Sequence, residues 1–340
     1  MKETKRFNVI ELFSGAGGLA LGLHQAGFDP LILIDFYEDA NRTLKINHPH
    51  WNVKTADIHD VATQGIFKYV DEQEVDLLSG GFPCQPFSYA GKQLGLDDTR
   101  GTVFHALAKI ISDVKPKLLL LENVRGLTTH DAGRTFKLIK SIIRNIGYTI
   151  DYKTLNAWNY GVAQKRERLI IIGIRQDYTA EFTWPSEENY KPVLRDVLKN
   201  VPPSEGQAYP EKKRRVLELV PPGGSWADLP DDIARDYLGK SYYSGGGKRG
   251  MARRLSWDEP SLTLTCSPAQ KQTERCHPDE TRPFTVREYA RIQGFPDTYQ
   301  FHGSTSSQYK QIGNAVPVNL AFHIGKQLFD LLIELEEASQ

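Results

Sequence analysis

The sequence predicts an α/β protein with a mostly parallel sheet and a second, smaller and loop-rich domain. Short, continuously apolar runs alternate with helical patterns over the first half of the chain, which is typical of a parallel sheet covered on both faces. A glycine-rich turn follows the first apolar run. After about Trp184 the sequence becomes rich in proline, glycine and charge, which indicates loops.

Composition narrows the class of protein. The 340 residues are enough for two domains, and 42 basic residues balance 42 acidic ones, so any binding of nucleic acid requires local positive charge. No run is long enough to span a membrane, and no signal peptide is predicted. Three cysteines argue against a disulfide framework and fit a reducing cytosol. We therefore expect a cytoplasmic protein.

The predicted elements follow in order from the N-terminus. Strands are expected at "FNVIELF", "PLILID", "VDLLSGG", "KLLLLENV" and "RLIIIGI". Apolar residues at helical spacing predict helices after the glycine-rich turn, at residues 103–115, around residues 138–146 and at the C-terminus. The basic run at residues 212–215 is read as a solvated helix face rather than a targeting signal.

The first turn predicts a nucleoside cofactor. In "FSGAGGLALG" the glycines Gly15, Gly17 and Gly18 allow a ligand to approach main-chain N–H groups where a helix begins. Asp35 ends the second strand, where it can bind ribose hydroxyls. The same pattern also fits a dinucleotide site, so the glycines alone do not identify the cofactor.

A cysteine marks the chemical end of the predicted sheet. Cys84 lies between two prolines just past a strand, where open α/β sheets place their ligands, and a thiolate there is a strong nucleophile. Glu122 ends the next strand at the same edge, and Arg166 and Arg168 lead into a further strand. A small buried thiol and an ion-paired acid are the alternatives for Cys84 and Glu122 taken singly.

The ordered motifs resemble those of the cytosine-C5 DNA methyltransferases. They are "FSGAGGL", "GGFPCQPFS", "ENV", "QKRER" and "QIGNAVP", and the match runs from residue 9 to about residue 326 except for the variable middle. The resemblance implies a Rossmann-like fold that binds S-adenosylmethionine, with no metal. It also implies that Cys84 adds to C6 of a flipped-out cytosine, so that C5 can accept the methyl group. Glu122, its pKa raised by burial, would act as a carboxylic acid that donates to N3 of the cytosine. Arg168, with Arg166, would hold the O2 edge of the ring.

The resemblance also implies roles for the cofactor residues. Those expected around the cofactor are Phe13, Gly15, Ala16, Gly17, Gly18, Asp35, Phe36, Asp57, Ile58, Pro83, Val103, Asn314 and Ala315. Asp35 would take the ribose, Phe36 would face the adenine, and Asp57 would accept from the adenine amino group. The family commonly has glutamate at the ribose position, so the shorter Asp35 is a departure.

The middle of the chain is expected to read the DNA sequence. Basic residues exceed acidic ones between residues 240 and 275, and "SLTLTCS" resembles the Thr-Leu element of these recognition domains. The candidate DNA contacts are Ser88, Arg249, Arg253, Arg254, Thr263, Gln270 and Gln272. Cys266, Cys276 and His277 lack the fourth ligand and the paired spacing of a zinc site.

These expectations define a DNA (cytosine-5)-methyltransferase. Residues 1–185 with 280–340 are predicted to form the catalytic and cofactor-binding domain, and residues 186–279 the target-recognition domain. The expected partner is double-stranded DNA, without membrane contact. We expect a monomer of the bacterial cytosol that modifies the site of a cognate restriction endonuclease without forming a stable complex with it.

Three alternatives remain open at this point. A transfer-RNA cytosine methyltransferase shares the architecture, but the Cys-Phe-Thr element of its eukaryotic family is absent from this sequence. An NAD-type oxidoreductase would explain the glycines and leave Cys84 and Glu122 without a role. A non-catalytic DNA-binding homologue is disfavoured because every catalytic position is filled.

Overall fold

A computed structural model describes residues 5–83, 102–243 and 250–338 of the chain. Cys84, Ser88 and Arg249 therefore lie outside the described residues. The chain divides into two compact units. The first comprises Met1–Asn156, Glu167–Glu187 and Val318–Gln340, and the second comprises Ala157–Arg166 and Glu188–Pro317. Each unit is described by itself.

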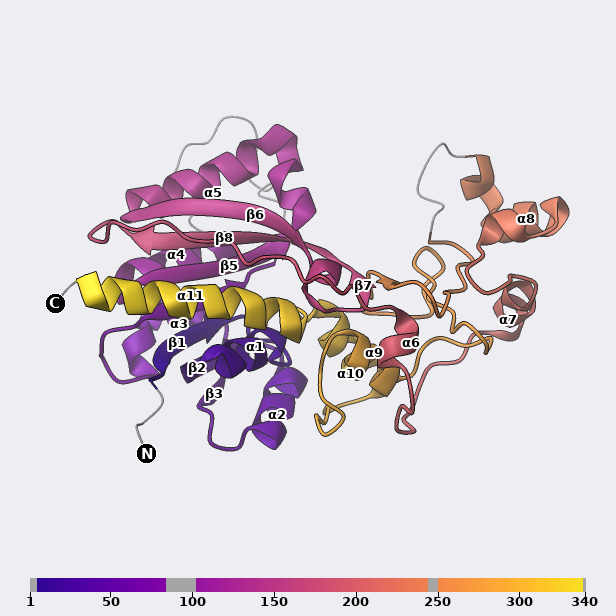
Figure 1. The fold of residues 1–340 in the computed structure, drawn as a ribbon, viewed down its shortest axis with the longest axis horizontal. Helices are drawn as coiled ribbons and strands as arrows, with labels where there is room; N and C mark the ends of the chain where they lie inside the picture. The colour runs from indigo at the N-terminus through magenta and orange to yellow at the C-terminus, as the bar shows by residue number, and fades with distance from the viewer. Residues whose placement is uncertain (1–4, 84–101, 244–249, 339–340) are drawn as a thin grey trace. The chain divides into compact units, whose positions relative to one another are not determined.

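A seven-stranded sheet forms the centre of the first unit (Figure 1). Its order is β3-β2-β1-β4-β5-β8-β6. The strands are β1 (Phe7–Leu12), β2 (Phe28–Asp35), β3 (Val53–Thr55), β4 (Leu77–Gly81), β5 (Leu118–Val124), β6 (Tyr148–Asn156) and β8 (Glu167–Arg175). The first five strands pair in parallel, whereas β8 is antiparallel to both β5 and β6. The predicted α/β class with a mostly parallel sheet is confirmed.

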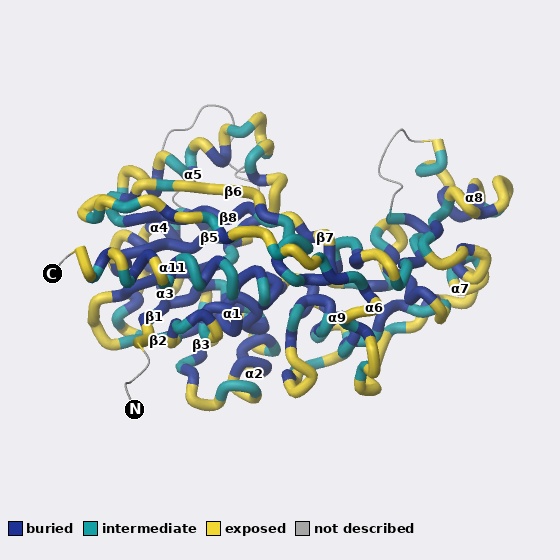
Figure 2. Tube along the Cα trace, in the orientation of Figure 1, coloured by how far each residue is buried: buried dark blue, intermediate teal, exposed yellow. Residues whose placement is uncertain are grey.

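Helices cover both faces of this sheet, as alternate residues of β2 demonstrate. Ile32 and Ile34 join a core cluster that includes side chains of three helices, α3, α4 and α5. Leu33, pointing to the other face, packs with α1 and α2. The tube in Figure 2 shows the resulting buried strands at the centre of the unit. The helices of the unit are α1 (Gly18–Ala26), α2 (Glu38–Asn47), α3 (Ile58–Gln64), α4 (Val103–Val114), α5 (Arg134–Asn145) and α11 (Val318–Ala338).

The C-terminal helix α11 packs closely on α1 because glycines face it. A Cβ on Gly22 would lie 2.5 Å from Cβ of Ala321, closer than two carbon atoms can approach. Further along the helix, the Phe329 ring meets the Phe7 ring of β1 edge-on at 5.1 Å. The expectation that the C-terminal helix returns to the neighbourhood of the first strand is confirmed.

The second unit has little regular structure. It contains a short parallel pair, β7 (Gln164–Lys165) with β9 (Ser261–Leu262), and a small core cluster that includes Leu217, Tyr237 and Met251. Its helices are α6 (Leu194–Val197), α7 (Glu211–Glu218), α8 (Asp231–Leu238), α9 (Val286–Ile292) and α10 (Thr305–Asn314). Residues 280–317, which sequence analysis assigns to the catalytic domain, belong to this compact unit. The predicted functional boundaries stay a prediction.

Candidate active site

The end of β1 forms a tight main-chain turn. Gly15 and Gly17 have φ of +51° and +85°, and even Phe13 adopts a left-handed φ of +58°, which is uncommon for a residue with a side chain. Gly80 on β4 faces this turn. A Cβ on Gly80 would lie 2.7 Å from the main-chain oxygen of Leu12, so glycine is required there. The main chain that follows β1 and the main chain of Gly80 on β4 therefore lie in close contact, without side chains between them, at the edge of the sheet where a ligand is expected.

Asp35, at the end of β2, holds this turn in place. Its Oδ2 accepts a bond from the Gly15 N–H at 2.8 Å, and its Oδ1 accepts one from the Tyr37 N–H at 2.7 Å. Each carboxylate oxygen can accept a further bond. The carboxyl group is therefore pre-oriented beside the glycine-rich turn, as a ribose-binding acid must be.

Four further candidate cofactor residues of the first unit lie just after a strand or where a helix begins. Phe36 follows Asp35 directly, and its side chain is 69 % exposed, which is unusual for phenylalanine and leaves the ring available for stacking. Asp57 caps α3 by accepting from the His59 N–H at 2.8 Å. Ile58 begins α3 and is buried, and half-buried Val103 begins α4. An exposed ring and an acid at neighbouring strand ends suit an adenine nucleoside.

The residues of the glycine-rich turn fit S-adenosylmethionine in their polarity and size. Ser14, within the glycine-rich turn, has a buried Oγ without a hydrogen-bond partner among the described residues, which marks a polar position that a ligand could satisfy. Buried Ala16 leaves the turn free of bulk. Asn314 is exposed, and its Oδ1 accepts from the Cys266 thiol at 2.9 Å. It and buried Ala315 lie in the second unit, so their cofactor role stays a prediction.

The segment that leads to the nucleophile is tied to β5. Asn123 donates from Nδ2 to the Phe82 carbonyl at 2.9 Å, and the Phe82 ring contacts the Phe104 ring of α4 at 5.3 Å. Exposed Pro83 follows, and Cys84 is the next residue in the sequence. This bond holds the last described residues of the segment beside the end of β5.

Glu122 and Arg168 form a buried ion pair at the same edge. Nε of Arg168 lies 2.7 Å from Oε1 of Glu122, and each side chain is only 12 % exposed. Burial lowers the pKa of the Arg168 guanidinium, with the charge of Glu122 opposing that effect. A Cβ on Gly81 would lie 2.9 Å from Oε2 of Glu122, so a side chain at this position would displace the Glu122 carboxyl group. The Glu122 carboxyl group and the Arg168 guanidinium are therefore in direct contact next to the segment that leads through Phe82 and Pro83 to Cys84.

Arg166 does not join this pair. It is 1 % exposed, and it donates to the carbonyls of Leu264 at 3.1 Å and Gly313 at 2.8 Å. A guanidinium bonded inside the second unit cannot hold the O2 edge of a cytosine. The assignment of Arg166 as a possible catalytic residue is therefore corrected to a structural one. No local pattern indicates this role, because the bonding partners of Arg166 are about 100 and 150 positions away in the chain.

Two of the candidate DNA-reading arginines are also engaged internally. Arg254 is 4 % exposed and donates to four main-chain carbonyls and the Thr281 hydroxyl, so its assignment to DNA is withdrawn. Arg253 donates to the Gly223 carbonyl and to Glu259 Oε2. Its side chain is 19 % exposed, which argues for a mainly structural role.

The other described candidates keep a surface position. Gln270 and Gln272 are exposed, and half-buried Thr263 donates its hydroxyl to the Lys165 carbonyl at 2.8 Å. Arg275 has a role that its sequence context does not predict: it is buried and donates from Nε and Nη2 to the Thr263 carbonyl at 3.2 and 3.1 Å. It thereby supports the Thr-Leu element, and its position in a basic stretch gave no sign of that role.

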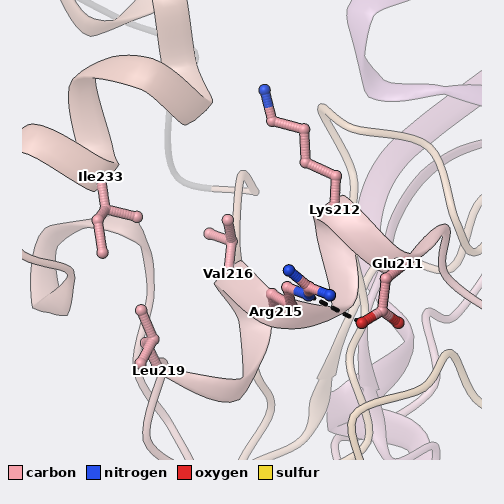
Figure 3. A pocket seen from close by; sticks show the side chains of 6 residues that line it. All are labelled: Glu211, Lys212, Arg215, Val216, Leu219 and Ile233. Carbon is pink, nitrogen blue, oxygen red and sulfur yellow. Dashed lines mark hydrogen bonds and ion pairs between the residues drawn. The ribbon is translucent and has the colours of Figure 1, made fainter.

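The basic run forms the first turns of α7, where acids oppose it. Lys213 pairs with buried Glu274 at 2.9 Å, and Arg215 pairs with Glu211 at 2.8 Å. An open pocket between α7 and α8 is lined by Glu211, Lys212, Arg215, Val216, Leu219 and Ile233 (Figure 3). It contains none of the motif residues. The run is a charge-paired helix face, in agreement with the reading from sequence.

Neither a metal-binding group nor a membrane-spanning helix is present among the described residues. Over residues 5–83, 102–243 and 250–338, no three His, Cys, Asp or Glu side chains are grouped so as to hold a metal ion. Within the same ranges, none of the helices combines the length and apolarity that crossing a membrane requires.

Comparison with known proteins identifies close relatives. The model of the C-5 cytosine-specific DNA methylases matches residues 7–330. The type II methyltransferase M.Sau96I of Staphylococcus aureus is 57 % identical over 98 % of this chain and 78 % of its own length. M.Eco47II of Escherichia coli, also a type II methyltransferase, is 55 % identical over 97 % of this chain and 81 % of its own.

Solved structures share the fold at lower identity. A mutant of DNMT2 from Spodoptera frugiperda superposes with a TM-score of 0.70 at 19 % identity, covering 95 % of this chain and 99 % of that one. The Entamoeba histolytica methyltransferase EhMeth gives 0.67 at 20 % identity, covering 97 % and 99 %. At such identities the likeness establishes the architecture alone.

Proposed function

The chain belongs to the C-5 cytosine-specific DNA methylase family, and on that premise we propose that Cys84, Glu122 and Arg168 form its catalytic site. The protein is a DNA (cytosine-5)-methyltransferase that uses S-adenosylmethionine. The observation that carries the residue assignment is the buried Glu122–Arg168 pair beside the segment that ends at Pro83. It supports a site built for a polar heteroaromatic ring.

The reaction begins with the nucleophile. The Cys84 thiolate adds to C6 of a cytosine flipped out of the duplex, and the electron pair of the C5–C6 double bond moves so that C5 becomes nucleophilic. C5 would then accept the methyl group that S-adenosylmethionine supplies when bound, and the electron pair of the broken carbon–sulfur bond would stay on the donor sulfur, which leaves as a neutral thioether. Loss of the C5 proton restores the double bond and expels Cys84 as thiolate.

Glu122 and Arg168 stabilise the charge that this addition creates. Negative charge moves toward N3 and O2 of the ring when the thiolate adds. As a carboxylic acid, Glu122 can donate to N3 through one oxygen while its other oxygen still accepts the bond from Arg168. The Arg168 guanidinium, which keeps its charge, faces the O2 edge.

The cofactor site is proposed at the glycine-rich turn. When bound, S-adenosylmethionine supplies an electrophilic methyl group. Asp35 would bind the ribose, Phe36 would stack on the adenine, and Asp57 would accept from its amino group. The main chain of Gly15 to Gly18 would border the ligand, and Ile58, Val103 and Pro83 would line its other sides.

We further propose the biological setting. Residues 186–279 would carry target recognition, with exposed Gln270 and Gln272 and the segment around Thr263 near the DNA. High identity to type II methyltransferases supports a role as the modification enzyme of a restriction–modification system. The enzyme would act in the bacterial cytoplasm as a monomer, with a cognate endonuclease that recognises the same site.

One set of experiments tests the catalytic assignment. Bisulfite sequencing of plasmid DNA from expressing cells should reveal 5-methylcytosine in one sequence context. With S-adenosylmethionine present, a duplex of that sequence with 5-fluorocytosine at the target should become covalently attached to the wild-type chain and not to C84S. The fluorine replaces the C5 hydrogen and cannot leave as a proton would, so Cys84 is not expelled.

The role of Glu122 is tested separately. E122Q should lower turnover by about 10²–10⁴ while DNA binding persists, because one general acid is lost. E167Q is the matched control, since Glu167 is exposed and pairs with Arg125 instead. Normal turnover in E122Q would remove Glu122 from the mechanism, and an adduct with C84S would remove Cys84.

A further inference from the structure

Two side chains hold the main chain of Leu264 from both sides. The Oε1 atom of Gln164 accepts from the Leu264 N–H at 2.9 Å. Nη1 of Arg166 donates to the Leu264 carbonyl at 3.1 Å. Leu264 follows Thr263 in the Thr-Leu element, so both polar groups of this residue are bound by the segment Gln164–Arg166 of the same compact unit. This fixes the peptide planes on either side of Leu264.

The same side chains also bind the segment before α11. Gln164 donates from Nε2 to Oε1 of Gln293 at 2.8 Å. Gln293 in turn donates to the carbonyls of Ile312 at 2.7 Å and Ala315 at 3.2 Å. Arg166 donates from Nη2 to the Gly313 carbonyl at 2.8 Å. One connected network therefore joins the Thr-Leu element to residues 312–315.

The side chains of this network are buried, so their polar groups need hydrogen-bond partners within the protein. Gln164 and Gln293 are 0 % exposed and Arg166 is 1 % exposed. Removing one partner leaves a buried polar group without a hydrogen bond, which destabilises this arrangement of the main chain. Gly313 adds a steric constraint, because a Cβ there would lie 2.6 Å from the Thr265 carbonyl carbon. The two stretches of main chain are thus held in direct contact.

We infer that Gln164 and Gln293 are positioning residues for target discrimination. They hold the Leu264 main chain in one place, and with it the neighbouring residues that meet the DNA. This inference rests on the proposed function, in which the segment around Thr263 faces the target sequence. Neither amide touches the reacting atoms; each acts through the peptide that it holds.

Discrimination is the property most sensitive to such positioning. Reading a base edge requires hydrogen-bond geometry that a wrong base pair cannot satisfy, and a loosened segment can adapt to either. Turnover depends instead on Cys84, Glu122 and Arg168, none of which bonds to Gln164 or Gln293. Because residues 312–315 include the predicted cofactor residues Asn314 and Ala315, kcat is measured with both cognate DNA and S-adenosylmethionine saturating. Losing the network should therefore reduce selectivity far more than kcat.

The test compares three glutamine-to-methionine variants of the full chain. Q164M and Q293M remove the amides of the network at nearly constant volume. Q311M is the matched control, because Gln311 is also buried in the second unit and donates to the His302 carbonyl and the Ser307 hydroxyl. For each, kcat and KM are measured on the cognate duplex and on a duplex with one altered base pair, alongside thermal unfolding.

We expect the ratio of kcat/KM for the two duplexes to fall about tenfold in Q164M and Q293M, with kcat on cognate DNA within about threefold of wild type. Q311M should lose comparable thermal stability and keep its selectivity. Should Q164M not fold, Q164E serves, since it keeps the acceptor for Leu264 and loses the donor to Gln293.

Two results would overturn the inference. One is unchanged selectivity in both network variants, or in Q293M and Q164E when these are the folded pair. The other is an equal loss of selectivity in Q311M, which would reduce the network to general stability. A wild-type chain that methylates no duplex would instead overturn the proposed function, so the two failures are distinguishable.

Discussion

At the scale of single residues, buried arginines organise the second compact unit. Arg166, Arg254 and Arg275 are each less than a tenth exposed and each donate to main-chain carbonyls. A guanidinium has five N–H donors in a rigid plane, so one side chain can join several loops that have no helix or strand to satisfy them. Such residues supply internal bonds in a region with little regular structure.

Arg254 gives the clearest prediction for this role. Its Nε donates to the Val220 carbonyl at 2.7 Å, and its Nη2 donates to the Leu217 carbonyl at 2.8 Å and to the Thr281 hydroxyl at 2.7 Å. R254A should lower the free energy of unfolding by roughly 3 kcal/mol or more, because several buried acceptors lose a charged donor. Urea denaturation followed by circular dichroism measures this change.

The control for Arg254 is a candidate DNA contact. R249A should leave the unfolding free energy near that of wild type and weaken DNA binding more strongly at low salt than at high salt, if Arg249 meets a phosphate. Wild-type stability in R254A, together with an altered methylation sequence, would restore Arg254 as a DNA-reading residue.

At the scale of elements, an acid joins β1, β4 and α1. Glu11 is 1 % exposed, and its Oε2 lies 3.3 Å from the Ser79 hydroxyl, directly across from it on β4. The Ala20 main chain near the start of α1 also bonds to the carboxyl, and none of the charged groups that act on Glu11 within the described part of the chain is a cation. Burial raises the pKa of Glu11 to about 8, and the charge of Asp35 adds to the rise.

The raised pKa of Glu11 predicts a pH-dependent stability. The folded chain keeps the proton up to about pH 8, while the unfolded chain releases it near 4.5. Unfolding therefore becomes easier as pH rises through this window, by up to about 4 kcal/mol. E11Q, which resembles the neutral acid, should be more stable than wild type at pH 8 and equally stable near pH 4.5.

Chemical denaturation at a series of pH values measures this difference. Subtracting the wild-type curve from that of E11Q cancels all other titrating groups. S79A is a useful companion variant, because it removes a bond to Glu11 without changing the charge. A constant gap between E11Q and wild type from pH 4.5 to 8.5 would show that Glu11 titrates normally.

The strands that sequence patterns predict are those with continuous apolar runs. "KLLLLENV" becomes β5 because both faces of the strand are buried. Strand β6 has no such run, since most of Tyr148–Asn156 is exposed or half-buried, and it was not predicted. The antiparallel direction of β8 depends on its pairing with β6, which local sequence does not encode.

The candidate site was predictable where it follows strand ends. Asp35 ends β2 and Glu122 lies two residues before the end of β5, and the ends of parallel strands meet at one edge of a sheet. The roles of Arg166 and Arg254 were not predictable, because an arginine in a basic stretch is the same in sequence whether it faces solvent or distant carbonyls. Only the long-range fold decides between these environments.

At the scale of the whole molecule, the compact units and the predicted domains divide the chain differently. The predicted recognition domain ends at residue 279. However, Arg254 donates to the Thr281 hydroxyl, and Cys276 forms an isolated antiparallel β-bridge with Pro283. It begins at residue 186, yet Gln164 binds Leu264. Contacts that support the recognition segment therefore come from both sides of the predicted boundaries.

This difference predicts how recognition can be exchanged between enzymes. One chimera takes residues 186–279 from a methylase of this family with a different target sequence, and a second takes residues 157–166 together with 188–317. In the second chimera, the counterparts of Gln164, Arg166 and Gln293 come from the donor together with Leu264. In the first, Leu264 comes from the donor, whereas the three side chains of the network come from the recipient.

We expect both chimeras to adopt the donor's target in bisulfite sequencing, because both carry its recognition segment. The first should unfold at a lower temperature and methylate less selectively, since mismatched partners leave buried polar groups without bonds. Equal stability and selectivity would mean that the boundary at residues 186 and 279 is sufficient. Methylation of the recipient's sequence by both would place recognition outside the second unit altogether.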